Sequence, residues 1–181
     1  MILSLFRRKP QRDTISILYG MIVAQARLPV FYRDYAIADT VNGRFDLIVL
    51  HLALVLDRLT ENGRLEPAGQ AVFDRFCRDM DDNLREMGIS DLKVPKEMKR
   101  MGEAFYGRSR AYLEALGDRR ALVSALTRNI YGGAPSANDA APRLAEYVVA
   151  AAAALKAQKL AAIVEGDVHF PDPALVTVPA T

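Results

Sequence analysis

Hydrophobic residues recur along most of this chain at the spacing i, i+3, i+4, which is the period of an amphipathic helix. The first such run predicts a helix that begins at a candidate N-cap, Asp13, and stops before Pro29. Residues 28–43 then predict an irregular connection. The apolar positions of the first helix are Ile15, Leu18, Tyr19, Ile22 and Val23.

The segment from Phe45 to Leu56 is apolar on nearly every side of a helix, interrupted only by Asp46 and His51. It is too short to cross a bilayer, so it predicts a helix buried at the centre of the domain. No uninterrupted run of 18 apolar residues occurs in the chain, so no membrane span is expected. The pair Asn62-Gly63 predicts a turn after the central helix.

Four more helices are predicted after that turn. Proline at a start and glycine at an end mark their limits, because proline suits the first helical turn and glycine suits the position after the last turn. The expected limits are Pro67 to Gly88, Pro95 to Gly117, Asp118 to Gly132-Gly133, and Ser136 to about Glu165.

The predicted fold class is therefore all-α, with a single compact helical domain of about six helices and an extended C-terminal tail. We find no alternating strand pattern, internal repeat or Gly/Ser linker, and 181 residues suit one domain. The expected parts are an N-terminal tip of residues 1–11, a helical domain of residues 12–166 and an extended, proline-containing tail of residues 167–181.

Composition narrows the class of protein further. The chain is 51% hydrophobic and 25% charged, and its net charge of +2 is too small to indicate a nucleic-acid partner by itself. Its single cysteine, Cys77, excludes an internal disulfide and suits a reducing compartment. The start, Met1 to Lys9, places apolar residues before three basic ones, the reverse of a secretory signal. We expect a cytoplasmic protein whose tip either contacts an anionic membrane surface or is a frayed terminus.

The sequence offers little for catalysis. Two histidines and one cysteine cannot build a zinc site, and no phosphate-binding glycine motif occurs. The acidic run at Asp79 begins like a calcium loop, but Leu84 and Ser90 stand where that loop needs glycine and glutamate. We therefore predict no catalytic residue, no metal and no cofactor. His51 is expected to be a hydrogen-bonded core residue. The alternative is a reactive pair of Asp46 with His51, the only such candidate in the sequence.

Charge and methionine are unevenly distributed. Residues 57–91 hold nine acidic and five basic residues, whereas residues 93–128 hold nine basic and four acidic ones. Such a bipolar domain suits a partner surface, although helix surfaces are commonly charged. Methionines cluster on two consecutive helices, which suits either a surface that repacks around varied apolar segments or ordinary core filling. These methionines are Met80, Met87, Met98 and Met101.

Two blocks carry a family resemblance. Residues 79–92 read DMDDNLREMGISDL and are followed by AFYGR at residues 104–108, and residues 43–59 form a second block upstream. Together they resemble the ubiquinol–cytochrome c chaperone family over roughly residues 30–131. The resemblance implies a helical, non-enzymatic chaperone that binds newly made cytochrome b and supports assembly of the respiratory bc1 complex. Because the start does not look like a transit peptide, we expect the bacterial form.

The same resemblance, joined to the residue pattern, gives the expected partners and sites. The expected partner is newly made cytochrome b, with a ribosome, a small co-chaperone and peripheral contact with the cytoplasmic face of the inner membrane left open, and no direct DNA contact. The expected client-binding residues are Phe31, Tyr32, Phe45, Met98, Met101, Phe105 and Tyr106, beside a basic surface of Lys96, Lys99, Arg100 and Arg108. The alternative is an RNA- or ribosome-binding protein that uses the basic helix 93–110.

Overall fold

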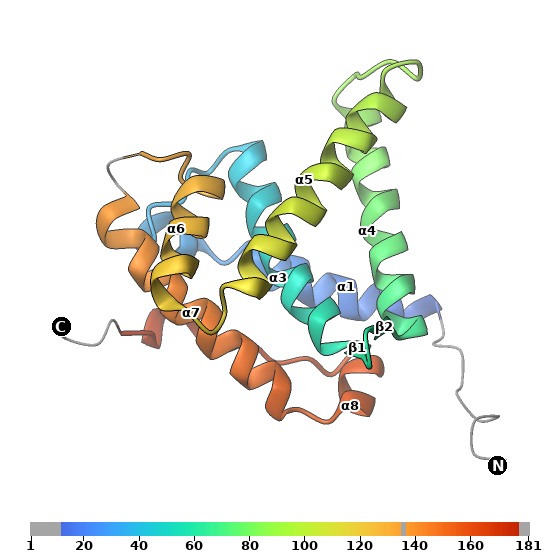
Figure 1. Ribbon diagram of the computed structural model, residues 1–181. Coiled ribbons are helices and arrows are strands. Elements are labelled where there is room, and N and C mark those ends of the chain that lie inside the picture. Colours follow the sequence, from blue (N-terminus) through green and yellow to red (C-terminus); the bar gives the residue numbers. More distant parts are fainter. Residues whose placement is uncertain (1–11, 135–136, 178–181) are drawn as a thin grey trace, which may run out of the picture.

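The computed structural model describes residues 12–134 and 137–177, which form a bundle of helices around one central helix (Figure 1). Six of the described helices have eleven residues or more, which confirms the predicted all-α fold of about six helices. The long helices are α1 (Arg12–Ala26), α3 (Val41–Arg58), α4 (Pro67–Glu86), α5 (Val94–Glu114), α6 (Arg119–Asn129) and α7 (Ala137–Ala157). The short elements are α2 (Pro29–Asp34), β1 (Thr60–Glu61), β2 (Arg64–Leu65), α8 (Leu160–Val164) and the 3₁₀ helix η1 (Pro173–Leu175).

Helix α3 is the predicted central helix and forms the middle of the core. Every residue from Asp46 to Val55 is buried, and α1, α4, α5 and α7 all pack against this helix. Thr40 caps its start, because the Thr40 hydroxyl accepts a hydrogen bond from the Gly43 N–H at 3.1 Å. An apolar helix with no polar face is stable only when it is covered on all sides, which explains why the other helices surround it.

Helices α4 and α5 leave this bundle together as an antiparallel pair, which ends in the loop of residues 87–93 at the upper right of Figure 1. Phenylalanine rings fill the space between them: Phe73 lies 5.0 Å and Phe76 5.7 Å from Phe105, measured between ring centroids. Gly88 ends α4 as predicted, with a φ of 80° that a side chain would strain. The pair is called the α4–α5 hairpin below.

The structure differs from the predicted elements in several places. The connection expected over residues 28–43 contains the short helix α2, which begins at Pro29. Residues Asn62 and Gly63 form the predicted turn, with φ values of 51° and 72°, but the turn joins the two strands β1 and β2. The predicted last helix breaks after Ala157 and resumes as α8. Asp13 lies in the first turn of α1, one residue inside its start, and the predicted cap at Ser136 lies outside the described residues.

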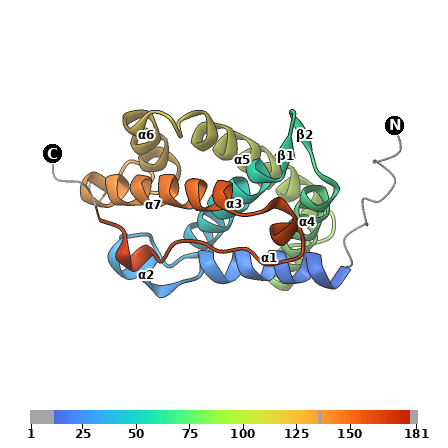
Figure 2. The same ribbon diagram turned by 90° about the horizontal axis from the view of Figure 1, so that it is seen from below.

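The C-terminal segment runs beside α1 as far as α2 (Figure 2). Side chains from earlier helices hold it there through its backbone. The Tyr35 hydroxyl donates to the carbonyl of Pro173 at 2.6 Å, and Gln158 bonds to both the N–H and the carbonyl of His169 at 2.8 Å. The described part of the predicted tail, residues 167–177, contains the short helix η1 and is packed against the bundle.

Two tyrosines join helices through polar contacts. The Tyr19 hydroxyl on α1 donates to Asp79 on α4 at 2.8 Å, so Asp79 belongs to a helix contact and not only to a solvated face. The guanidinium of Arg75 lies 5.4 Å from the centroid of the Tyr19 ring. Cys77 on α4 is half-buried, and this burial raises the pKa of its thiol.

His51 is the buried polar centre of the bundle. Its Nδ1–H faces the carbonyl of Leu47 at 2.7 Å, so its Nε2 accepts a hydrogen bond from the Tyr147 hydroxyl on α7 at 2.8 Å. Phe31 and Phe170 meet the imidazole edge-on. The prediction of a hydrogen-bonded core histidine is confirmed, and burial lowers the pKa of His51 to about 4.

Among the described residues, one segment is long and apolar enough to cross a membrane, namely Asp13–Asp34. The sequence alone predicts none, because charged residues interrupt this stretch. In the structure the segment is divided into α1 and α2, since the helix ends at Ala26 and Pro29 starts the next one.

We expect His51 to make folding stability depend on pH. Its pKa is lower in the folded chain than the ordinary value of 6.5, so its contribution is fully present above pH 6.5 and is lost as the pH falls towards 4. Wild type should therefore lose up to ~3 kcal/mol of unfolding free energy relative to His51→Gln over this window. Urea unfolding followed by circular dichroism measures the difference. Parallel pH profiles of the two proteins would contradict the assignment.

Candidate functional site

A groove lies between the α4–α5 hairpin, the start of α3 and the end of α6, and we call it the hairpin groove. It has a volume of about 550 Å³. Four separate elements supply its walls, so it exists only when the hairpin is placed against the bundle. Its lining residues are Val41, Asn42, Phe45, Asp46, Leu84, Met87, Glu97, Arg100, Met101, Ala104, Arg108, Asn129, Ile130 and Gly132.

Much of this lining is apolar, and part of it is unusually exposed. Val41 has 66% and Met87 54% of its surface accessible, although both are large hydrophobic residues. Phe45 and Met101 are partly buried beside them and pack on the core. Side chains left uncovered in this way gain free energy when a second apolar surface covers them. The hairpin groove can therefore bind an apolar segment.

Arg108 connects the groove wall to a buried charge. Its Nη2 lies 2.9 Å from Oδ1 of Asp46, while its guanidinium carbon lies 5.6 Å from the centroid of the Phe45 ring. The two atoms are close enough for an ion pair, but the N–H of Arg108 does not point at the oxygen well enough for a hydrogen bond. Oδ1 of Asp46 therefore has no hydrogen-bond partner. Burial raises the pKa of Asp46 to about 6, and the positive charge of Arg108 opposes that rise.

Two further buried hydroxyls on α5 have no hydrogen bond of good geometry within the described part of the chain. They are Oγ of Ser109 and the hydroxyl of Tyr112, and the neighbours of Tyr112 include Asp46 and Asn129. Burial and the nearby Asp46 raise the pKa of Tyr112 far above its usual value. Unpaired polar atoms of this kind cost free energy. Helices α3 and α5 therefore bury polar atoms at a cost in free energy, and one of these residues, Asp46, lines the groove.

Helix α5 carries several exposed cations, of which Arg100 lines the groove, and acidic residues on the same helix pair with some of them. Arg100 lies 3.3 Å from Glu97, Lys99 lies 3.8 Å from Glu103, and Arg110 lies 2.8 Å from Glu114. These exposed pairs weaken the positive field of the helix without removing it, because exposed ion pairs are weak and the sequence of this region remains net basic.

The structure brings four of the predicted site residues together in the groove: Phe45, Met101, Arg100 and Arg108. Lys96 and Lys99 are exposed on α5 outside its lining, and Met98 packs partly on the core. Tyr106 is exposed and packs on Phe73, outside the groove.

The other predicted positions lie elsewhere. Phe31 is fully buried against Tyr35, His51 and Tyr147, so it has no surface to offer a client in this conformation. Phe105 is buried between α4 and α5. Tyr32 lines a different pocket, among arginines. Sequence periodicity cannot separate these aromatics, because each lies on the apolar side of its own helix.

Sequence reasoning also missed lining residues. Val41 and Ile130 sit at the start of α3 and just after α6, where the periodic pattern gives no signal of exposure. Met87 belongs to the methionine cluster of the sequence, but the sequence does not indicate that it lines the site. Only the direction in which the α4–α5 hairpin leaves the bundle reveals these three residues as neighbours.

Comparison with known proteins agrees with this architecture. The model of the ubiquinol-cytochrome C chaperone family matches residues 33–170, which extends the resemblance through α7 and α8. The crystal structure of the Cbp3 homolog from Brucella abortus has a TM-score of 0.84 and 39% sequence identity, and it covers 98% of this chain and 100% of that one.

A curated relative points the same way. Ubiquinol-cytochrome-c reductase complex assembly factor 1 of Xenopus laevis is 28% identical over 118 residues, or 62% of this chain. The chain spans 58% of the length of that relative. Since the family model matches most of the residues and a solved structure matches nearly all of them, the chain belongs to the ubiquinol–cytochrome c chaperone family, a family of bc1-complex assembly factors.

Proposed function

We propose that this protein is a non-enzymatic chaperone that holds newly made cytochrome b in the hairpin groove and thereby supports assembly of the bc1 complex. The observation that carries the proposal is the groove itself, in which exposed Val41 and Met87 flank a partly buried apolar floor. Family membership supplies the assembly role, and the groove supplies a surface that fits an apolar client.

The energetics of such a groove suit reversible holding. Each ~100 Å² of apolar surface covered contributes about 2.5 kcal/mol, before the cost of ordering the client. A groove of this size therefore gives moderate affinity, so that the client can be released into the growing complex. Methionine side chains such as Met87 and Met101 adapt their shape to different apolar neighbours, which suits a client that has not yet folded.

A catalytic alternative has no support from the one candidate pair in the sequence. Both ring nitrogens of His51 are engaged, with Leu47 and Tyr147, and the ring is fully buried. Asp46 instead faces Arg108 and the groove. The two residues therefore do not act on a common substrate site.

The buried carboxylate in the lining of the groove fits the same proposal. Oδ1 of Asp46 has no hydrogen-bond partner among the described residues. A client segment that brings an N–H or O–H donor into the groove would relieve part of the cost of this unpaired atom. The groove therefore favours an apolar segment that carries a donor over a purely aliphatic one.

The resemblance to the family extends the proposal to the cellular location and the further partners of the protein. A multi-spanning client has to be held close to the bilayer, so we place the protein in the cytoplasm, at the cytoplasmic face of the inner membrane. A ribosome and a small co-chaperone are further partners under this proposal. The RNA-binding alternative rests on α5, where the pairing of Lys99, Arg100 and Arg110 with glutamates reduces the charge available for phosphates.

We expect the double substitution Val41→Asp/Met87→Asp to reduce recovery of cytochrome b about tenfold. The reason is that it places two charges where the apolar surface of the client has to lose its water. Both side chains are exposed, so the fold should tolerate the change. The measurement is a pull-down of tagged protein from respiring cells, solubilised in mild detergent, with mass spectrometry. The matched control is Leu92→Asp/Leu175→Asp, which changes two exposed apolar residues outside the groove. Equal recovery with both double variants would refute the groove as the client site.

Charge reversal on α5 tests electrostatic steering. Lys96→Glu/Lys99→Glu/Arg100→Glu should slow capture of cytochrome b in a cell-free translation reaction and flatten its dependence on salt, because cations near a groove accelerate encounter more than they prolong binding. Arg64→Glu/Arg78→Glu/Arg120→Glu changes the net charge equally at exposed positions elsewhere and should leave capture unchanged. Capture with unaltered salt dependence in the first variant would exclude steering. Recovery of RNA alone would favour the RNA-binding alternative.

The Asp46→Asn variant tests the cost of the buried Asp46 carboxylate. The folded-state pKa of Asp46, about 6, lies above its ordinary value of 3.8, so ionisation as the pH rises through this window destabilises the fold. We expect Asp46→Asn to be more stable than wild type by about 1–3 kcal/mol at pH 7.5, with the difference vanishing near pH 4. Urea unfolding at both pH values measures it. A variant less stable than wild type at pH 7.5 would show that the ion pair with Arg108 outweighs burial.

A further inference from the structure

The outward face of α1 carries exposed apolar residues, and Gly166 of the C-terminal segment lies close to one of them, Ile17. Asp13, Ile17, Gly20, Ala24 and Arg27 follow the spacing i, i+4, i+7, i+11, i+14, and all five are exposed. Ile17 has 56% of its surface accessible, and Met21 on the flank of this line has 41%. Gly20 and Ala24 lie between them, and the line ends in Arg27. This surface is called the α1 face.

Part of the apolar surface of this region is not covered by the core. The segment Asp13–Asp34 is apolar enough to cross a membrane. Val23, Leu28 and Val30 of this segment are half-buried and pack on the core, whereas Ile17 and Met21 remain exposed. The apolar surface that points outward is therefore that of Ile17 and Met21.

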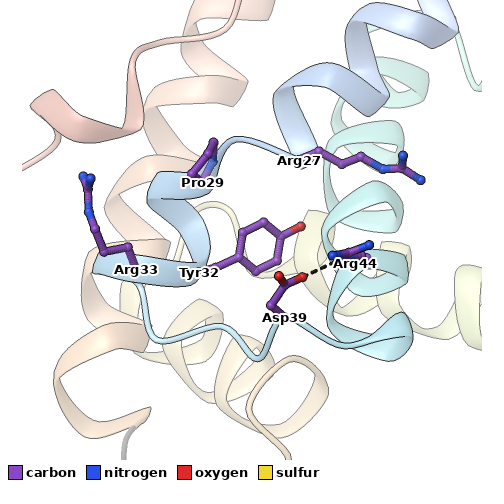
Figure 3. A pocket seen from close by; sticks show the side chains of 6 residues that line it. All are labelled: Arg27, Pro29, Tyr32, Arg33, Asp39 and Arg44. Carbon is purple, nitrogen blue, oxygen red and sulfur yellow. Dashed lines mark hydrogen bonds and ion pairs between the residues drawn. The ribbon is translucent and has the colours of Figure 1, made fainter.

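An arginine-lined pocket lies where the α1 face ends. It has a volume of about 560 Å³ and is lined by Arg27, Pro29, Tyr32, Arg33, Asp39 and Arg44 (Figure 3). In that view the Tyr32 hydroxyl points towards the side of the pocket that holds Arg27 and Arg44, whereas Arg33 points away from them.

The charges of this pocket are only partly neutralised. Arg44 pairs with Asp39 at 2.7 Å, and Arg33 pairs with its neighbour Asp34 at 2.6 Å. Arg27 forms no ion pair with any residue that the structure describes, and the residue is exposed. An anion with several oxygen atoms, such as a phosphate group, can therefore bind Arg27. It can also form an ion pair with Arg44 while Arg44 keeps its contact with Asp39.

We propose that the α1 face and the arginine-lined pocket together form a docking surface for an anionic lipid bilayer. Ile17 and Met21 would enter the interfacial layer, while lipid phosphate groups bind between Arg27 and Arg44. Apolar side chains beside arginines on one helix face are the composition of interfacial membrane-binding helices. The proposal is independent of the hairpin groove and of its client.

Charge complementarity favours this occupant over a dimer that packs two α1 helices in parallel. Such a dimer would bring two arginine-lined pockets towards each other, and like charges oppose that contact. An antiparallel dimer keeps the pockets apart, and the experiment below distinguishes it by self-association. A free phosphate ion would use the pocket but leave the apolar face unexplained. In the sequence, the apolar and basic residues Met1–Lys9 precede α1, so the experiment must separate their contribution from that of the α1 face.

The test is flotation of the full-length protein with vesicles of phosphatidylcholine, alone or mixed with phosphatidylglycerol. We expect binding only to the anionic vesicles, and about fivefold weaker binding for each arginine removed in Arg27→Gln and Arg27→Gln/Arg44→Gln. Ile17→Ser/Met21→Ser should also weaken binding several-fold. Matched controls outside the surface are Arg64→Gln/Arg78→Gln and Leu92→Ser/Leu175→Ser, which should bind like wild type.

Several results would overturn the proposal. Equal binding to both vesicle types would exclude recognition of anionic lipid. If the arginine and apolar variants bind like wild type while deletion of residues 1–11 abolishes binding, the N-terminal residues and not the α1 face bind the vesicles. Binding of inorganic phosphate without vesicle binding, or self-association that these variants disrupt, would assign the surface to a free anion or to a second copy of the chain. Recovery of cytochrome b in detergent by the same variants shows that they are folded. It also separates this proposal from the client-binding one, because the two surfaces use different residues.

Discussion

A hydrogen bond between two side chains far apart in the sequence organises the interior of this protein. The Tyr147 hydroxyl on α7 donates to His51 at the middle of α3, and Gln25 on α1 donates to the same hydroxyl at 3.0 Å. Three helices are thereby joined at one point inside an otherwise apolar core. A buried imidazole without these partners would be strongly unfavourable, so this arrangement fixes how α1, α3 and α7 sit relative to one another.

The α4–α5 hairpin depends on that arrangement but does not share its full burial. Its inner half rests on α3 through Phe45, Phe76 and Phe105, while its outer half projects beyond the bundle (Figure 1). Where two helices project from a core, other helices do not cover all of their surface. The hairpin groove lies at such an incompletely covered face of the α4–α5 hairpin. The buried Asp46 and its imperfect contact with Arg108 lie at the point where hairpin and bundle meet.

The hairpin groove and the surface proposed for lipid use different residues, although Arg44 and Phe45 are neighbours at the start of α3. Under the two proposals, a client and a lipid surface would therefore not compete for the same side chains. Both surfaces combine apolar side chains with arginine. This combination suits a factor whose client is a membrane protein before insertion is complete, because such a client presents apolar segments close to anionic headgroups.

Local structure is the part that the sequence by itself determined. The period of the apolar residues placed the six long helices, Asp118 caps α6 by accepting from the Ala121 N–H at 3.1 Å, and Gly88 ends α4 with a positive φ. These features depend on neighbours within a few residues. The motifs at residues 79–92 and 104–108 likewise indicated the family, since a family signature is a property of the sequence.

Only the tertiary structure decided which apolar residues are accessible. Phe31 and Phe45 look alike in the sequence, but Phe31 is enclosed by residues of α3 and α7 whereas Phe45 lines the groove. The break between α7 and α8 and the packing of the C-terminal segment also depend on distant partners. Exposure is set by what the rest of the chain places against a residue, and the period of a single helix does not contain that information.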